Sequence, residues 1–198
     1  MSMFLLHRFA GSGELPPGTA TRHARFVAEH KDVLIAYGPI SQGRRGSGYA
    51  YYTNHVSGSA ELARFLSDDP LAASSETIVE PWRHARIGRH QDVIAERPGF
   101  LGFLLFAPGV PNCESRRLEL LDAHRRYFAA RNETNFVAGG PLVAHDDPEK
   151  WRGTSFVIEM ASREDFDEFL ANEPFYMSKL YQSVDVYDWS RGPIILPG

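Results

Sequence analysis

Cysteine is nearly absent from this chain of 198 residues. The single Cys113 excludes an internal disulfide framework and any zinc site built mainly from cysteines. Long apolar runs are missing as well, since a run such as 103–107 falls far short of the roughly 20 residues that a helix needs to cross a bilayer. Residues 1–8 turn polar too early for a signal peptide. We therefore expect a cytoplasmic protein with no membrane partner.

The chain also lacks an excess of positive charge. Its net charge is −4, which gives no reason to expect a nucleic-acid partner. No glycine-rich nucleotide-binding motif follows a predicted strand, and no histidine or cysteine cluster has metal-ligand spacing. We expect neither a cofactor nor a metal. Apolar residues make up 43% of the chain and aromatic residues 12%, which is enough to bury a core.

Short motifs of the first half recur in the second half, at a spacing that rises along the chain. A duplication followed by small insertions produces such a drift. The matched pairs are Phe4-Leu5-Leu6 with Phe103-Leu104-Leu105, His23 with His124, Gly38-Pro39 with Gly140-Pro141, Asp69-Pro70 with Glu173-Pro174, and Trp82 with Trp189. The sequence therefore predicts a first repeat over 1–82, a linker over 83–98, a second repeat over 99–189 and a C-terminal arm over 190–198.

Each repeat has the pattern strand, helix, strand, strand, helix, strand. The expected strands are 3–9, 33–37, 49–53 and 77–82, then 100–106, 135–138, 154–160 and 184–189; the expected helices are about 19–30, 57–66, 115–131 and 162–170. Gly38-Pro39 and its counterpart 139–141 are interpreted as turns that end a strand. This order is that of a ferredoxin-like unit, a four-stranded antiparallel sheet with two helices on one face. We predict an α+β protein in which two tandem ferredoxin-like units bury their open sheet faces against each other.

The second repeat also contains several short family-like motifs. They are His124, 138–142, 153–159, 169–175 and 183–189. With them, both repeats resemble the YCII-related family of dimeric α+β barrels. The resemblance implies a barrel normally made by two chains and built here by one. It also implies a small pocket in each unit, with a helix histidine inside, and elimination or isomerisation of small acids. The family tends to carry an aspartate before a proline at the end of the second helix. The first repeat has this aspartate, Asp69, but the second repeat has Glu173, so the two pockets are not expected to be equivalent.

His23 and His124 are the candidate catalytic residues, because each lies on the apolar stripe of the first helix of its repeat. A histidine there suits proton transfer near neutral pH. The alternative is a core histidine bonded to a backbone carbonyl. Asp69 and Glu173 are expected to orient the two rings, unless they are exposed residues at the end of a helix.

The candidate substrate-binding residues are Arg44, Arg125 and Tyr176. Arginine forks suit carboxylate ligands, and Tyr176 has a phenol near Glu173. Solvated loop and helix positions are the competing interpretation for both arginines.

The leading functional hypothesis is a cofactor-independent, general acid–base lyase or isomerase that acts on a small organic acid, of the kind found in aromatic-compound catabolism. His124 is the expected base and His23 its counterpart. Two alternatives stay open: a non-catalytic ligand-binding or accessory protein, and a cofactor-free monooxygenase on the same barrel. The first repeat is shorter between Pro70 and Trp82, which makes it the expected inactive copy. Two chains could also pair as a homodimer through the arm at 190–198.

Overall fold

Eight antiparallel strands form a closed barrel in the computed structural model, which describes residues 2–9, 15–42, 46–54, 56, 59–83, 91, 97–130 and 136–193. The barrel order is β1-β3-β2-β8-β5-β7-β6-β4. The strands are β1 (Ser2–Phe9), β2 (Leu34–Gln42), β3 (Gly46–Thr53), β4 (Ser75–Trp82), β5 (Leu101–Pro108), β6 (Phe136–Val143), β7 (Trp151–Met160) and β8 (Asp185–Trp189). The predicted α+β class is confirmed in this form.

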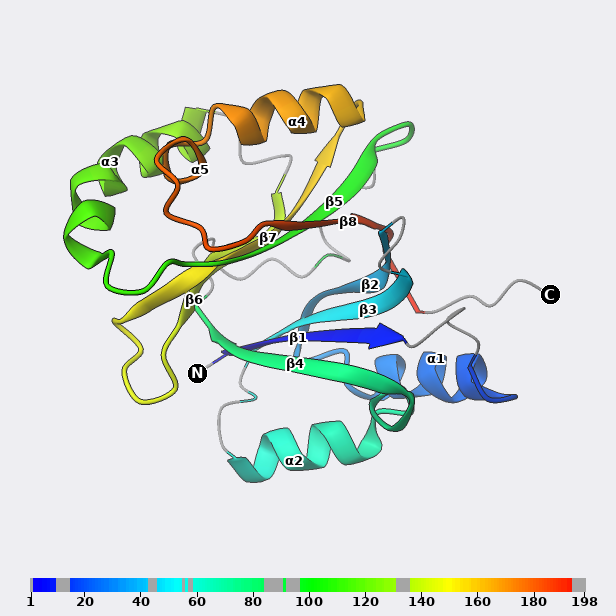
Figure 1. Cartoon of the computed structure of the whole chain (residues 1–198). Coiled ribbons are helices and arrows are strands. Elements are labelled where there is room, and N and C mark those ends of the chain that lie inside the picture. Colours follow the sequence, from blue (N-terminus) through cyan, green and yellow to red (C-terminus); the bar gives the residue numbers. More distant parts are fainter. Residues whose placement is uncertain are drawn as a thin grey trace.

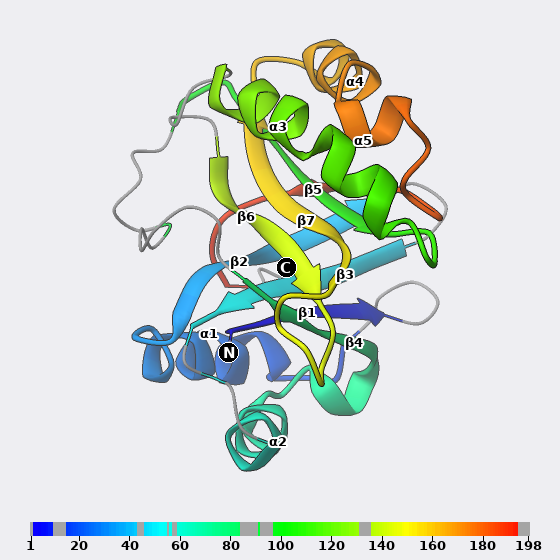
Figure 2. The same cartoon turned by 90° about the vertical axis from the view of Figure 1, so that its left-hand side faces the viewer.

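Helices cover two opposite sides of the barrel (Figure 1). They are α1 (Thr19–Glu29), α2 (Ser59–Asp68), α3 (Glu114–Ala130), α4 (Arg163–Ala171) and the single-turn α5 (Pro174–Met177), with a short 3₁₀ helix at Ala72–Ser74. Figure 2 shows α1 and α2 on the side opposite to α3, α4 and α5. Within the described residues, no helix is both long and apolar enough to span a bilayer.

The two halves of the chain have the same internal strand order. It is β4-β1-β3-β2 in the first half and β8-β5-β7-β6 in the second. Two seams close the barrel: β2 pairs with β8, and β4 pairs with β6 through Trp82 and Leu142. Because each seam joins the halves, each half covers the sheet edges of the other.

The interior of the barrel is a packed core. Phe4, Tyr52, Trp82 and Trp189 fill it together with smaller aliphatic side chains. The Tyr52 hydroxyl lies 2.6 Å from Ser155 Oγ, which links the two halves inside the core. A filled barrel of this size leaves no channel, so a ligand site has to lie on the outer face, between the sheet and the helices.

One predicted equivalence between the repeats is wrong. Phe4 and Leu6 point into the barrel, whereas Phe103 and Leu105 point out toward the helices. Side chains alternate between the two faces of a strand, so a shift of one residue moves every side chain to the other face. In orientation, Phe4 therefore corresponds to Leu104, which also faces the interior.

The predicted turn at Gly38-Pro39 is also wrong, because β2 continues through it. Pro39 accepts a hydrogen bond at its carbonyl from Ser190 N, at 3.1 Å. Gly38 is needed for close approach, since a Cβ there would overlap the Ser190 carbonyl and the Trp189 ring. The counterpart at 139–141 likewise lies inside β6. Helix α5 was not predicted.

Parts of the predicted linker and arm pack on the same chain. Gln91 is buried, and its side-chain oxygen accepts a hydrogen bond from Tyr37 N at 2.8 Å. Arg191 forms a nearly buried ion pair with Glu159 at 2.8 Å. The rest of the linker, apart from residues 83, 97 and 98, and residues 194–198 of the arm lie outside the described residues. The domain boundaries stay predictions.

Candidate active site

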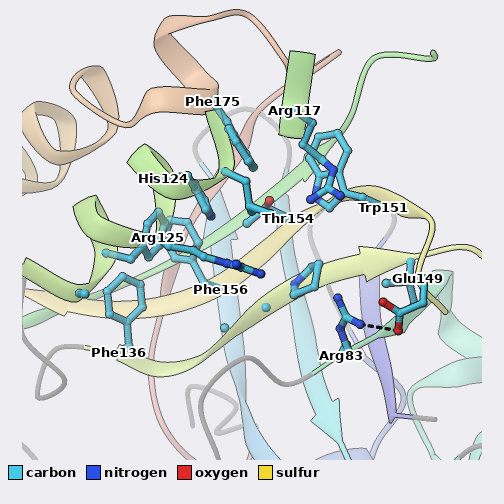
Figure 3. A pocket seen from close by; sticks show the side chains of 17 residues that line it. Arg83, Arg117, His124, Arg125, Phe136, Glu149, Trp151, Thr154, Phe156 and Phe175 are labelled. Atoms are coloured by element: carbon cyan, nitrogen blue, oxygen red, sulfur yellow. Dashed lines mark hydrogen bonds and ion pairs between the residues drawn. The ribbon is translucent and has the colours of Figure 1, made fainter. Parts of the chain in front are cut away.

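A cavity of about 670 Å³ lies between α3 and the outer face of β6 and β7. Its floor is made by Gly139, Gly140, Thr154 and Phe156. Aromatic and arginine side chains form its walls. The aromatic ones are Phe128, Phe136, Trp151 and Phe175, and the arginines are Arg83, Arg117 and Arg125 (Figure 3). The combination of apolar walls with a few polar groups is typical of a small-molecule site.

His124 projects from α3 into this cavity and is bonded to Glu173. The distance between His124 Nδ1 and Glu173 Oε1 is 2.6 Å. The Glu173 side chain is only 1% exposed, whereas 17% of His124 is exposed. A carboxylate at Nδ1 selects the tautomer with hydrogen on Nδ1 and leaves the lone pair on Nε2. Nε2 is therefore the atom available to a ligand.

Glu173 is held in place by the backbone of α5. It is the N-cap of that helix, and its two oxygens accept hydrogen bonds from Phe175 N at 3.0 Å and Tyr176 N at 2.7 Å. Side-chain capping of free helix amides is common, and an acid suits the N-terminal end. Pro174 at the first helical position ends the preceding helix and starts α5. The carboxylate position is thus fixed by local sequence.

The imidazole ring of His124 is fixed by aromatic packing. Phe175 stacks on it with ring centroids 4.0 Å apart and an interplanar angle of 6°. Phe128 packs at 4.6 Å with a tilt of 45°. Glu173 holds Nδ1, and the two phenyl rings restrict rotation of the imidazole. Nε2 is therefore held in one orientation, toward the cavity.

Tyr181 lies beside the buried carboxylate. Burial and the negative charge of Glu173 raise the pKa of Tyr181 well above its ordinary value, so the phenol stays protonated. Thr154, which lines the cavity, is a further polar neighbour of this phenol.

Two small residues open this cavity. Gly139 lies opposite Phe156, and Thr154 lies opposite Pro141. At the matching register of the first half, Tyr37 lies opposite Tyr51 and Tyr49 lies opposite Pro39. The four corresponding positions are Gly139 with Tyr37, Phe156 with Tyr51, Thr154 with Tyr49, and Pro141 with Pro39. Two tyrosine rings thus fill in the first half the volume that is open in the second.

His23 is accordingly a core residue with no exposed surface. Its Nε2 lies 2.7 Å from the Tyr51 hydroxyl, and its ring meets the edge of Tyr49 at 4.4 Å. Burial lowers the pKa of His23 to about 4, against the opposing effect of Asp69 and with the help of nearby His7. The imidazole is therefore neutral near pH 7.

Asp69 makes its ion pair with a residue that was not predicted. Its Oδ2 lies 2.9 Å from Nε2 of His7, and both side chains are fully buried. The other carboxylate oxygen accepts a hydrogen bond from Leu71 N at 2.9 Å. The Tyr51 hydroxyl is the partner of His23. The expected His–carboxylate contact is thus present in the second half, whereas in the first half Asp69 contacts His7 and His23 contacts Tyr51.

The predicted substrate-binding residues have different outcomes. Arg125 lines the cavity from α3. Tyr176 is 41% exposed and is not a lining residue, and the phenol whose pKa is raised by the Glu173 charge is that of Tyr181. Arg44 lies outside the described residues. Arg83 and Glu149 line the mouth but were not identified from sequence, because no local motif marks either position.

Comparison with known proteins identifies the half of the chain that holds this cavity. Residues 102–190 match the family model of the YCII-related domain. Residues 102–190 are a YCII-related domain. The cavity residues contributed by α3, β6, β7 and α5 all belong to this domain. No curated protein sequence matches the chain.

Two solved structures, the first two described below, share the barrel fold. A monooxygenase-like protein of Lactobacillus acidophilus NCFM is 13% identical, with a TM-score of 0.53 and coverage of 99% of both chains. Chlorite dismutase of Candidatus Nitrospira defluvii is 8% identical, with a TM-score of 0.58, over 96% of this chain and 91% of the other. A 5-chloro-2-hydroxyhydroquinone dehydrochlorinase of Burkholderia phenoliruptrix AC1100 is 23% identical, with a TM-score of 0.42, over 46% of this chain and 95% of the other. The likeness to the first two proteins concerns the fold and not the reaction.

Proposed function

We propose that the YCII-related domain is an acid–base enzyme, a lyase or isomerase acting on a small organic acid. The observation that carries this proposal is the His124–Glu173 pair, with Nδ1 bound to a buried carboxylate and Nε2 directed into a cavity. A histidine oriented in this way is a general base, and the carboxylate stabilises the imidazolium that forms.

The proposed step begins with removal of a proton from a carbon next to a carbonyl. The C–H bond breaks, Nε2 of His124 takes the proton, and the electron pair moves onto the substrate oxygen as an enolate. Arginine side chains at the walls, Arg125 among them, stabilise that negative charge. In an isomerase, the imidazolium returns the proton to another carbon. In a lyase, the electron pair of the enolate expels a leaving group, and the imidazolium gives its proton to that group, which restores the base.

The aromatic walls favour a planar, partly apolar substrate. Phe128, Phe136 and Trp151 at the walls and Phe156 at the floor offer ring faces and edges, and the charged groups at the walls are mainly arginines. Stacking and offset contacts with such rings suit an aromatic acid or lactone. This supports the substrate class of the leading hypothesis, and catabolism of aromatic compounds stays a prediction.

We further propose that the two halves are ferredoxin-like copies of one unit and that only the second is catalytic. Equal strand order in the halves and the equivalent core positions of Trp82 and Trp189 support a duplication. Tyr37 and Tyr49 support the inactivity of the first copy, because they fill its site. The pairing of two chains into a homodimer, the absence of a cofactor and the cytoplasmic location also stay predictions.

The proposal is tested by incubating the protein with a panel of small aromatic acids and lactones in D₂O. Proton NMR then follows deuterium uptake at carbon and the formation of products. We expect at least one compound to exchange or react, and His124→Gln to abolish it. Tight binding of panel members without exchange or product would instead support a non-catalytic ligand-binding protein. Consumption of O₂ would support a monooxygenase.

A further inference from the structure

The barrel seam brings a residue of the first half to the cavity of the second. Trp82, the last residue of β4, pairs with Leu142 of β6. The next residue, Arg83, donates its backbone N–H to the Pro141 carbonyl at 3.0 Å. Because Pro141 is itself a wall of the cavity, the Arg83 side chain lies at the mouth. The cavity is therefore completed by the other half of the chain.

Arg83 is paired at the mouth with Glu149, from the loop between β6 and β7. Arg83 Nη1 and Glu149 Oε1 are 2.8 Å apart, and the two side chains are 50% and 79% exposed. The loop is held by a hydrogen bond from Glu149 N to the Asp147 carboxylate at 2.9 Å. Exposed ion pairs of this kind contribute little to stability. An incoming anion can therefore replace Glu149 at small cost.

The other arginines of the cavity are placed differently. Arg117 is engaged by both oxygens of Glu114, at 3.0 and 2.6 Å. Arg125 makes no ion pair or side-chain hydrogen bond with any other described residue, and it extends into the cavity from α3 (Figure 3). Arg83 and Arg125 thus approach the ligand space from two walls, and Glu149 is the only carboxylate among the described lining residues.

We propose that Arg83 is a specificity-determining residue that binds the carboxylate of an aromatic acid in the YCII-related domain, and that Glu149 is its exchangeable counter-ion. A guanidinium fork matches a carboxylate in geometry as well as in charge. The aromatic walls hold the ring, and the free Nε2 of His124 lies on the α3 side. That this ligand is a substrate rests on the proposed function. That Arg83 binds a carboxylate does not.

The experiment measures binding of 4-hydroxybenzoate and its neutral analogue 4-hydroxybenzamide by isothermal titration calorimetry at pH 7. The proteins are the full-length wild type, Arg83→Leu, Glu149→Gln and Arg25→Leu. Arg25 is the matched control, because it forms an exposed ion pair with Glu29 at 2.7 Å on α1, which lies on the opposite side of the barrel. Thermal unfolding of each variant checks that it is folded.

We expect Arg83→Leu to raise the Kd of the benzoate about tenfold or more and to change that of the amide by less than about twofold. Glu149→Gln should lower the Kd of the benzoate several-fold, because it frees Arg83, and Arg25→Leu should change neither. Equal weakening of both compounds by Arg83→Leu, no weakening of either, weaker benzoate binding by Glu149→Gln, or no binding of the benzoate to the wild type would each overturn the proposal.

Failure of the proposed function gives a different result. His124→Gln can leave turnover unchanged while the Kd of the benzoate still differs between Arg83→Leu and the wild type. In that case the acid–base assignment is wrong and the carboxylate site stands. If His124→Gln abolishes turnover and Arg83→Leu leaves the Kd of the benzoate and KM unchanged, the acid–base assignment stands and the carboxylate site is wrong.

Discussion

Thr154 in the second half occupies the position of Tyr49 in the first half, each opposite the proline of a Gly-Pro pair. This exchange, together with Gly139 in place of Tyr37, leaves the space beside His124 open and fills the space beside His23. One barrel thus contains an open histidine site and a closed one.

Substitution of Thr154 by tyrosine should close the open cavity. The added ring would occupy the volume that Tyr49 occupies in the first half, and we expect binding of 4-hydroxybenzoate to weaken at least about tenfold. Overpacking should lower the free energy of unfolding by about 1–3 kcal/mol. Calorimetry and thermal unfolding measure both effects. Thr154→Val is the control, because it removes the hydroxyl without filling space; unchanged affinity in Thr154→Tyr would contradict the explanation.

Glu173→Gln tests the negative charge of Glu173 apart from its role as the N-cap of α5. Glutamine keeps an oxygen for the cap of α5 but loses the negative charge that stabilises the imidazolium. We expect kcat for a substrate found in the panel to fall by about 10²- to 10⁴-fold, with a much smaller change in KM. Glu173→Asp, which keeps the charge, should recover part of the rate. A rise in KM with no change in kcat would mean that Glu173 acts only in binding.

Tyr181→Phe tests whether the phenol beside the buried carboxylate supports Glu173. The substitution removes a polar neighbour of that carboxylate, so we expect kcat to fall and the unfolding free energy to drop by about 0.5–1.5 kcal/mol. Tyr176→Phe is the matched control, since it removes a phenol from the neighbouring but exposed side chain. Equal effects of the two variants on kcat would exclude the special role of Tyr181.

His23 should make the fold sensitive to acid. Its pKa is about 4 in the folded chain and 6.5 ordinarily, so the unfolded chain binds a proton over this interval that the folded chain does not. The contribution of neutral His23 to the free energy of unfolding is complete above pH 6.5. It falls, as the pH drops toward 4, by up to about 1.4 kcal/mol per pH unit. Urea unfolding of wild type and His23→Gln between pH 4 and pH 8 measures the difference. A variant whose stability falls as steeply as that of the wild type would contradict the assignment.

The sequence was informative where the determining pattern is local. The helical stripe predicted that His124 points from α3 toward the sheet, where it lines the cavity, and Glu173 was expected to orient its ring, which it contacts at 2.6 Å. The repeat predicted all eight strands and four of the five described α-helices. These features depend on periodicity and capping, which short stretches of sequence determine.

The remaining features depend on contacts between distant strands. The pairing of β2 with β3 and of β6 with β7 decides that Tyr49 corresponds to Thr154, and the seam between β4 and β6 brings Arg83 to the cavity. A motif match cannot give strand register, as the Phe4 and Phe103 equivalence shows. Gly38-Pro39 resembled a turn because the reason for its glycine, close approach of Trp189 and Ser190, lies in another strand.

The most direct test of the account compares two histidine variants at the same helix position of the two halves. Deuterium uptake from D₂O into a substrate is measured by NMR for wild type, His124→Gln and His23→Gln. If only the second half is catalytic, exchange is lost in His124→Gln and retained in His23→Gln. Exchange that persists in His124→Gln, or that is lost in a folded His23→Gln, would contradict it.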